Sequence, residues 1–216
     1  MTTTITPTDL PRKRFARAYP KMAATAEQRG ATEHRRRLLK GLQGRVVEIG
    51  AGHGLTFPLY PAAVTEMVAL EPEPTLRARA EKAAADAPVP VRVLAGVADA
   101  LPLEDAGFDA AVTSLVLCSV DDQQKALGEI RRVLRPDGEL RFYDTSSPMP
   151  AKGTLLQIAD HSGLWPKLAG GCHPARDTTT LTRAGFEIET IDRFGFAPGR
   201  FDPLIPHILG TARRPS

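Results

Sequence analysis

The residues with the clearest chemical potential lie in the stretch GRVVEIGAGHGLTFPLY, residues 44–60. Three glycines stand there at alternate positions, Gly50, Gly52 and Gly54, directly after an apolar run that contains Glu48. Glycine adopts backbone conformations that are closed to other residues and lets a ligand approach the main chain. A phosphate, a dinucleotide or a nucleoside could each occupy such a loop, so the spacing and the neighbouring charges must decide.

Two acids flank this loop and favour a nucleoside that carries an amino acid. Dinucleotide-binding loops read G-x-G-x-x-G, whereas this one reads G-x-G-x-G and contains no Lys or Arg. Glu71 lies 21 residues beyond Gly50, at the end of the next expected strand, where a carboxylate can accept both hydroxyls of a ribose. Glu48, at the head of the loop, could receive an ammonium group. S-adenosylmethionine has both a ribose and an amino-acid part.

Alternating strand and helix patterns after Arg45 must position these groups. They predict one α/β domain with a seven-stranded, mostly parallel, Rossmann-like sheet. The expected strands are 46–50, 66–71, 91–96, 108–117, 138–144, 186–194 and 204–214, and the expected helices after Arg45 are 54–60, 76–85, 123–134 and 175–184. A turn at 135–138 is expected to stop the third of these helices. The last two strands are joined by a loop rather than a helix, so they are expected to pair antiparallel.

The chain of 216 residues has the length of a single domain. Phe15, Tyr19, Met22 and Ala26 recur at helical spacing, Phe15 and Tyr19 have the spacing of a buried face, and Gly30 is expected to separate this helix from a second one. The predicted segments are a disordered tail (1–11), a helical lid (12–42), a donor-binding core (45–145), an insertion that roofs the substrate (146–174), and a C-terminal helix with two strands (175–216).

Composition excludes several classes of protein. Apolar residues make up 42% and charged residues 25% of the chain, as in ordinary globular proteins. No apolar run approaches the ~20 residues of a membrane span, and the N-terminus lacks the apolar core of a signal peptide, so we expect a cytoplasmic protein. Two cysteines, Cys118 and Cys172, make neither a disulfide framework nor a Cys-x-x-Cys metal site. No metal is expected, because Asp121-Asp122 stands where a helix cap is needed.

Four motifs together resemble the class I S-adenosylmethionine-dependent methyltransferases, in particular the subgroup similar to ubiquinone/menaquinone C-methyltransferases. They are VVEIGAGHG, VALEPEP, AGVADALPLEDAGFDAAVTSLVLCSVDD and EIRRVLRPDGELRFYD. The segments LVLCSV, GGCHPARDTTTLTRAGF and PHILGTARR are most similar to alkyl-thiol S-methyltransferases and to bacterial relatives labelled phospholipid N-methyltransferases. The resemblance implies in-line transfer of the methyl group of S-adenosylmethionine to an apolar small-molecule thiol, hydroxyl, amine or quinol, leaving S-adenosylhomocysteine.

The resemblance also implies which residues form the site. The donor would be held by Glu48, Gly50, Ala51, Gly52, Gly54, Glu71, Pro72, Val97, Ala98 and Leu115, and the acceptor would contact Tyr19, Cys118, Trp165 and His173. Val97 replaces an acid that is usual in the family, and Asp99 could substitute for it. Relatives often carry Glu-His where this chain has Asp144-Thr145, so any catalytic role of that histidine is absent here.

The order of preference among possible general bases follows from their place in the chain. His173 ranks first, because it lies in the predicted roof, and Asp144, His161 and His53 follow. We expect His207, on the last strand, to be structural.

Three other functions stay open at this point. Residues 12–45 hold eleven Lys and Arg against two acids, so the protein could be an RNA methyltransferase that binds phosphates through this segment. No base-gripping Asn/Asp-Pro-Pro-aromatic motif follows the fourth strand, which argues against nucleic acid. A nicotinamide-dependent dehydrogenase and a non-catalytic donor-binding protein are the other two alternatives. We expect a monomer or a homodimer.

Overall fold

A computed structural model describes residues 13–146, 172, 179–199, 202 and 204–216. The predicted tail lies outside these residues, as does almost all of the predicted roof. Of the described helices, none has the length and apolar content that crossing a membrane requires.

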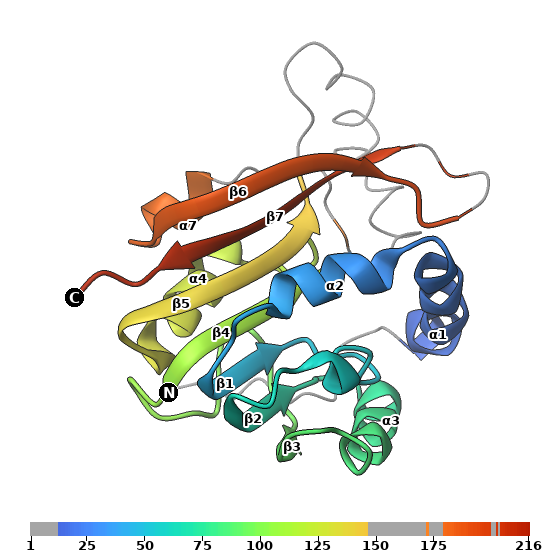
Figure 1. Ribbon diagram of the computed structural model, residues 1–216, viewed down its shortest axis with the longest axis horizontal. Helices are drawn as coiled ribbons and strands as arrows, with labels where there is room; N and C mark the ends of the chain where they lie inside the picture. Colours follow the sequence, from blue (N-terminus) through green and yellow to red (C-terminus); the bar gives the residue numbers. More distant parts are fainter. Residues whose placement is uncertain (1–12, 147–171, 173–178, 200–201, 203) are drawn as a thin grey trace.

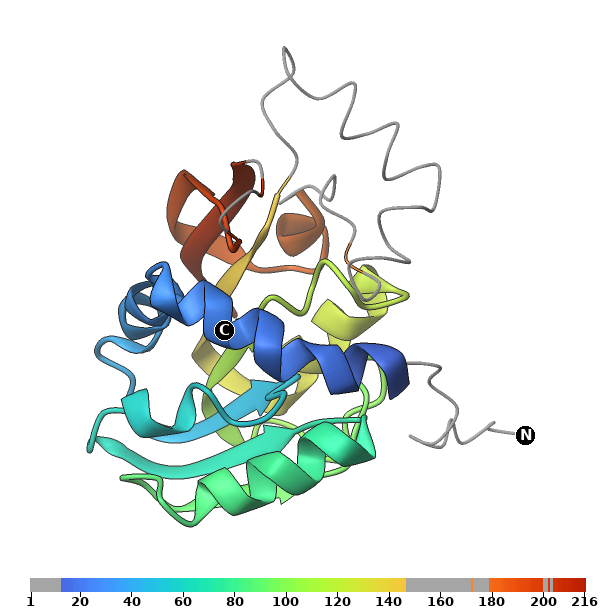
Figure 2. The ribbon, with the colours of Figure 1, turned by 90° about the vertical axis from the view of Figure 1, so that its right-hand side faces the viewer.

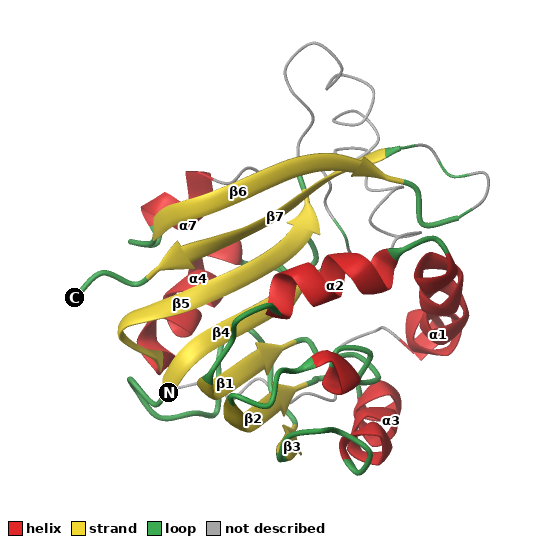
Figure 3. Ribbon diagram, in the orientation of Figure 1, coloured by secondary structure: helices red, strands yellow, loops and turns green. Residues whose placement is uncertain are grey.

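A single seven-stranded sheet forms the centre of the protein (Figures 1 and 3). Its strands are β1 (Gly44–Ile49), β2 (Val64–Leu70), β3 (Val91–Leu94), β4 (Phe108–Ser114), β5 (Leu134–Thr145), β6 (Glu187–Phe196) and β7 (Ile205–Arg213). They lie in the order β3-β2-β1-β4-β5-β7-β6. The pairs from β3 to β5 are parallel, and β7 is antiparallel to both β5 and β6. The predicted fold class is thereby confirmed, with the reversal of strand order between β1 and β4.

Helices cover both faces of this sheet. They are α1 (Lys13–Gln28), α2 (Ala31–Leu39), α3 (Pro74–Ala84), α4 (Gln123–Val133), α7 (Thr179–Arg183) and the 3-10 turn η2 (Phe57–Leu59). The strands are buried from both sides because one apolar cluster joins them to α2, η2 and α3, and a second joins them to α4 and α7. Figure 1 shows α2 in front of the sheet and α4 behind it.

Some expected boundaries differ from the observed ones. The expected helix at 54–60 is only the three-residue turn η2, because the glycine loop before it has left-handed backbone angles that a helix cannot use. The expected turn at 135–138 is a bulge within β5, which already begins at Leu134. The break at Gly30 is confirmed, with φ of 105°, and Asp122 caps α4 by accepting the Lys125 N–H at 3.0 Å.

Helix α1 lies across the carboxyl ends of the strands (Figure 2). Ala16 and Ala23 are buried on it, and Met22 is 50% exposed. Side chains from this helical region reach β6 and the residues after it: Arg29 Nε donates to the carbonyl of Ala197 at 2.8 Å, and Arg37 pairs with Asp192. These contacts fix the helices at the edge of the sheet where ligands bind in open α/β folds.

Candidate active site

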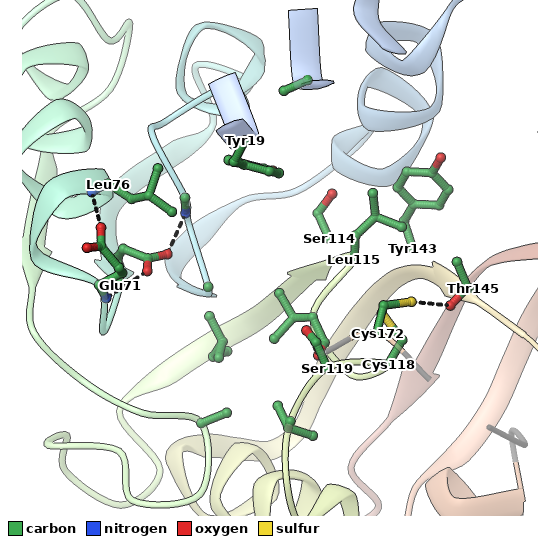
Figure 4. Close-up of a pocket in the computed structure, with 18 of the residues that line it drawn as sticks. Tyr19, Glu71, Leu76, Ser114, Leu115, Cys118, Ser119, Tyr143, Thr145 and Cys172 are labelled. Atoms are coloured by element: carbon green, nitrogen blue, oxygen red, sulfur yellow. Dashed lines mark hydrogen bonds between the residues drawn. The ribbon is translucent and has the colours of Figure 1, made fainter. Parts of the chain in front are cut away.

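A cavity of about 370 Å³ lies at the carboxyl ends of the parallel strands, beneath α1. Ligand pockets typically measure ~300–1,000 Å³, so this one can enclose most of a nucleoside-sized molecule. Figure 4 shows Glu71 and Leu76 on one side of the space and Cys118, Thr145 and Cys172 on the other, with Tyr19 above. We call these the donor end and the acceptor end.

The glycine loop forms one wall of the donor end through its main chain. Gly50 and Gly52 have φ of 70° and 60°, which side chains other than hydrogen rarely allow. A Cβ on Gly50 would lie 2.5 Å from Val116 Cγ2, and one on Gly52 would lie 3.1 Å from the Tyr19 ring. The residue type is therefore fixed at both positions by backbone angle and by space.

Glu71 lies at the other side of this loop with its carboxylate fixed. The residue is 6% exposed, its Oε2 accepts the Gly52 N–H at 2.8 Å, and its Oε1 accepts the Glu73 N–H at 2.9 Å. Each carboxylate oxygen can accept more than one hydrogen bond, so two anchored oxygens at the cavity wall can still receive the hydroxyls of a ribose.

Glu48 lies behind the loop and does not line the cavity. Its oxygens accept the Thr56 hydroxyl at 2.8 and 2.7 Å and the Tyr60 hydroxyl at 2.9 Å. Burial raises the pKa of Glu48 to about 7, and these hydrogen bonds together with the charge of Arg35 oppose the rise. These contacts fix the chain segment that follows the glycine loop. The Glu48 carboxylate is therefore not placed to bind a ligand ammonium group directly.

Arg35 is a residue that our sequence reasoning missed. It is 4% exposed and is the one Lys or Arg among the described residues that line the cavity. Its guanidinium pairs with Glu27, which also accepts the Thr32 hydroxyl. Arg35 stands on the same helical stripe as buried Ala31, Leu38 and Leu39, and that spacing was the signal that could have separated it from its exposed neighbours.

The acceptor end begins at Leu115, where β4 ends. Leu115 has φ of 59°, and its N–H donates to the Tyr143 carbonyl at 2.7 Å. A left-handed leucine is strained, so the contact with β5 holds it in place. Next along the chain, Cys118 is buried, and its contact with the Cys172 thiol and its burial raise its pKa well above the usual range. The Sγ of Cys172 lies 3.3 Å from Thr145 Oγ1.

Asp144 is buried beneath this end and does not line the cavity. Its Oδ1 and Oδ2 each accept the Cys118 N–H at 3.2 Å, and Oδ1 accepts the Thr145 N–H at 2.9 Å. Burial raises the pKa of Asp144 to about 6. As the structure places it, the carboxylate positions the loop after β4 and has no contact with the cavity through which it could act as a base.

His207 lines the acceptor end together with Tyr143. Its Nδ1 lies 2.8 Å from the Ile205 carbonyl, and its ring stacks on Tyr143 with a centroid separation of 5.5 Å. The Tyr143 hydroxyl is buried and has no hydrogen-bond partner among the described residues. Burial raises the pKa of Tyr143.

Comparison with known proteins agrees with this geometry. Residues 47–142 match the family model described as a methyltransferase domain. Thiol S-methyltransferase TMT1B of Mus musculus is 31% identical over 180 residues, which cover 81% of this chain and 73% of the mouse protein. The chain belongs to the class I S-adenosylmethionine-dependent methyltransferases. The dehydrogenase alternative is thereby rejected.

The methyltransferase is also similar to a demethylmenaquinone methyltransferase of Renibacterium salmoninarum, at 33% identity over 55% of this chain and 51% of that protein. Among solved structures, a possible histamine N-methyltransferase of Thermotoga maritima superimposes with a TM-score of 0.70 at 23% identity, covering 94% of this chain and 98% of that one. The [4+2]-cyclase SpnF superimposes with a TM-score of 0.75 at 18% identity, covering 94% of each chain. These two structures show the fold alone.

S-adenosylmethionine is the cofactor of this methyltransferase. The enzyme transfers the methyl group of the cofactor to a small-molecule acceptor. The residues present fit this donor, because the cavity offers a glycine cradle that any Cβ would fill, a fixed carboxylate for the ribose and a buried guanidinium. Predicted donor residues that line the cavity are Gly50, Gly52, Glu71, Pro72, Val97, Ala98 and Leu115, whereas Glu48, Ala51 and Gly54 do not. A Cβ on Gly54 would meet Phe57 and Ala83 at 2.9 Å, so this glycine serves packing behind the loop.

Of the predicted acceptor residues, some line the cavity and others do not. Tyr19 and Cys118 line the cavity, whereas Trp165 and His173 lie outside the described residues, as does His161. His53 does not line it; its ring meets Tyr19 edge-on at 5.4 Å. Asp99 lines the cavity near Val97, and its carboxylate lies 3.7 Å from Lys125 Nζ.

Proposed function

We propose that this methyltransferase methylates the sulfur of a small, mostly apolar thiol. One observation carries the proposal: a single cavity joins the donor end at Glu71 to an acceptor end whose described wall from β5, β7 and Cys172 has no carboxylate, while Asp121, which lines the cavity after β4, is exposed to solvent. An amine acceptor would need an anionic partner for its ammonium group. The similarity to a thiol S-methyltransferase over 81% of the chain supports the same choice.

In this proposal the donor end binds three parts of S-adenosylmethionine. Glu71 accepts the ribose hydroxyls, and the stretch Gly96–Val97–Ala98 contacts the adenine. Arg35 pairs with the carboxylate of the methionine part, because it is the buried cation at the cavity wall. When bound, the donor supplies a methyl group already activated by its sulfonium.

The protein then positions the two reacting groups and excludes water from the cavity. Tyr19 covers the glycine loop from α1, and Leu115 is held in a strained conformation by its hydrogen bond to β5. Fixed alignment of two reacting groups can lower a barrier by up to ~7–11 kcal/mol. Methyl transfer to a good nucleophile therefore needs little beyond a rigid, dry cavity and a way to ionise the acceptor.

The basic N-terminal segment fits a small-molecule acceptor better than RNA. Three of its cations, Arg35, Arg37 and Arg45, pair with the acids Glu27, Asp192 and Glu66. The division of the chain into lid, core and roof, the cytoplasmic location, and the monomer or homodimer remain predictions. Size-exclusion chromatography with light scattering would test the oligomeric state.

An acceptor panel tests the proposal. The protein is incubated with S-adenosylmethionine that carries a trideuterated methyl group and with alkyl thiols, an aromatic thiol, phenols, amines, demethylated quinols or RNA. Mass spectrometry is expected to find the methyl thioether, with kcat/KM for the best thiol at least ~10-fold above that for any amine or phenol. Labelled quinol or amine without labelled thioether would overturn the choice of sulfur.

A further inference from the structure

A thiol acceptor must lose its proton before or during methyl transfer. The thiolate is the nucleophile, and an ordinary thiol has a pKa of about 8.5, so only a few per cent is ionised at neutral pH. A positioned base whose own pKa lies near the working pH removes this limit. The acceptor end should therefore hold a group that can accept a proton.

Most described groups at the acceptor end cannot do this. Asp144 directs both oxygens at backbone N–H groups, also accepts from the Cys118 thiol, and does not itself line the cavity. The pKa values of Tyr143 and Cys118 are raised, so both stay protonated. Thr145 carries a neutral hydroxyl that already contacts Cys172. Among the described carboxylates and imidazoles that line this end, Asp121 is exposed to solvent and His207 is buried, so His207 is the candidate.

The hydrogen bond at Nδ1 decides the tautomer of His207. A carbonyl oxygen only accepts, so the 2.8 Å contact with Ile205 places a proton on Nδ1. In the neutral ring the lone pair is then on Nε2. Burial lowers the pKa of His207, against the effect of the Ile205 carbonyl, and neighbouring His34 adds to the lowering. The ring is therefore neutral at pH 7, with the lone pair on Nε2.

The position of this ring is fixed by the strands on either side. His207 pairs with Thr145 in the register of β5 and β7. Because Thr145 contacts Cys172, and Cys172 contacts Cys118, this register sets His207 beside the two thiols of the acceptor end. Its ring stacks on Tyr143 and Phe194 and meets Phe196 edge-on at 5.7 Å. The titratable groups that face it are His34 from α2 and Tyr143 from β5, and neither supplies a negative charge at neutral pH.

We propose that Nε2 of His207 is the general base that ionises the acceptor thiol, an inference that rests on the proposed thiol methylation. The S–H bond breaks as its proton moves to Nε2. The electron pair left on the acceptor sulfur forms the new bond to the methyl carbon, while the bond from that carbon to the sulfonium breaks and its pair remains on the sulfur of S-adenosylhomocysteine. The imidazolium afterwards releases the proton to water.

The test compares two thiols in the full-length His207→Asn variant. The Asn amide nitrogen occupies the place of Nδ1 and can keep the bond to the Ile205 carbonyl, but nothing replaces Nε2. One acceptor is an alkyl thiol, and the other is an aromatic thiol that is fully ionised at neutral pH. We expect kcat/KM to fall ~100-fold for the alkyl thiol and less than ~3-fold for the ionised thiol. Glu189→Gln on the neighbouring strand β6, whose side chain pairs with Arg213 and does not line the cavity, is the control and should leave both rates unchanged.

The pH profile adds a readout that a structural role would not change. In the wild type, kcat/KM for the alkyl thiol should fall on the acidic side as His207 becomes protonated, whereas in His207→Asn it should follow the ionisation of the thiol itself. Equal loss with both thiols, at unchanged donor affinity, would overturn the assignment of His207 and leave thiol methylation standing. If the wild type methylates neither thiol, the proposed function fails and the assignment falls with it.

Discussion

The donor end and the acceptor end of the cavity are built in different ways. At the donor end, the glycine loop and the Glu71 carboxylate lie close together in the sequence, as in the bond from the Gly52 N–H to Glu71 across 19 residues, and Arg35 and residues 96–98 complete the wall. At the acceptor end, Cys118, Thr145, Cys172 and His207 come from four distant parts of the sequence. A constant cofactor suits a local, rigid motif, whereas the acceptor end can vary without disturbing it.

If this division is correct, the largest effect should come from removing the ribose contact. Glu71→Ala loses hydrogen bonds to a charged acceptor, each worth about 1.5–3 kcal/mol. We expect donor affinity to fall at least ~100-fold, measured by isothermal titration calorimetry, with the same loss whichever acceptor is present. Glu66→Ala, on strand β2 just before Glu71, is the control, because its side chain pairs with Arg45 and does not line the cavity. An affinity within about twofold of wild type would disprove the donor assignment.

Each end rests on a buried carboxylate whose pKa is raised by burial, and amide substitutions should separate the two. The pKa of Glu48 is raised to about 7 by burial. Its protonated form therefore favours folding, and the stability it supplies below its ordinary pKa is lost as pH rises through 7. Glu48→Gln should raise the free energy of unfolding at pH 8 by ~1–3 kcal/mol and change it little at pH 4.5, in urea titrations.

Asp144→Asn provides the contrast: burial raises the pKa of Asp144 to about 6 as well, but both of its oxygens accept backbone N–H groups. An amide offers these donors one oxygen instead of two, so no comparable gain in stability is expected at pH 8. If both substitutions stabilised the protein equally, the two carboxylates would not differ in the way that their hydrogen bonds indicate.

Substitution of Arg35 should weaken binding of the donor and leave binding of the acceptor unchanged. Arg35→Gln is expected to weaken S-adenosylmethionine ~10-fold and to weaken decarboxylated S-adenosylmethionine much less, because the lost contact is to the carboxylate. Arg36→Gln, one position along α2 with a 60% exposed side chain, is the matched control. Equal weakening of both donors would indicate that Arg35 supports the helices rather than the ligand.

The smallest effect should come from the wall of the acceptor end. The Tyr143 hydroxyl is buried without a partner among the described residues, so Tyr143→Phe removes a polar group that folding must desolvate. The free energy of unfolding should stay the same or rise by up to ~1 kcal/mol, with donor affinity unchanged, in denaturant titration and calorimetry. A loss of more than ~1 kcal/mol would show that this hydroxyl makes a stabilising contact.

The same contrast explains which features were predictable from the sequence. Local patterns set the strands, the glycine loop and Glu71, and these were located within a few residues. The position of Glu48 just before the glycine loop predicts a contact with the ligand, but its side chain points to Thr56 and Tyr60 behind the loop.

Residues of the acceptor end depended on long-range packing. His207 was expected to be structural, and only the register of β7 against β5 sets it beside Thr145 at the cavity. Arg35 belonged to a basic cluster in which local composition could not distinguish the buried member from the exposed ones.

A crystal structure of the protein with S-adenosylhomocysteine and an alkyl thiol bound together tests the two-ended cavity most directly. The account predicts that the ribose hydroxyls bind Glu71, and that the thiol sulfur lies between the donor sulfur and His207. A ribose bound away from Glu71, or a thiol bound outside the wall formed by Cys118, Thr145 and His207, would contradict it.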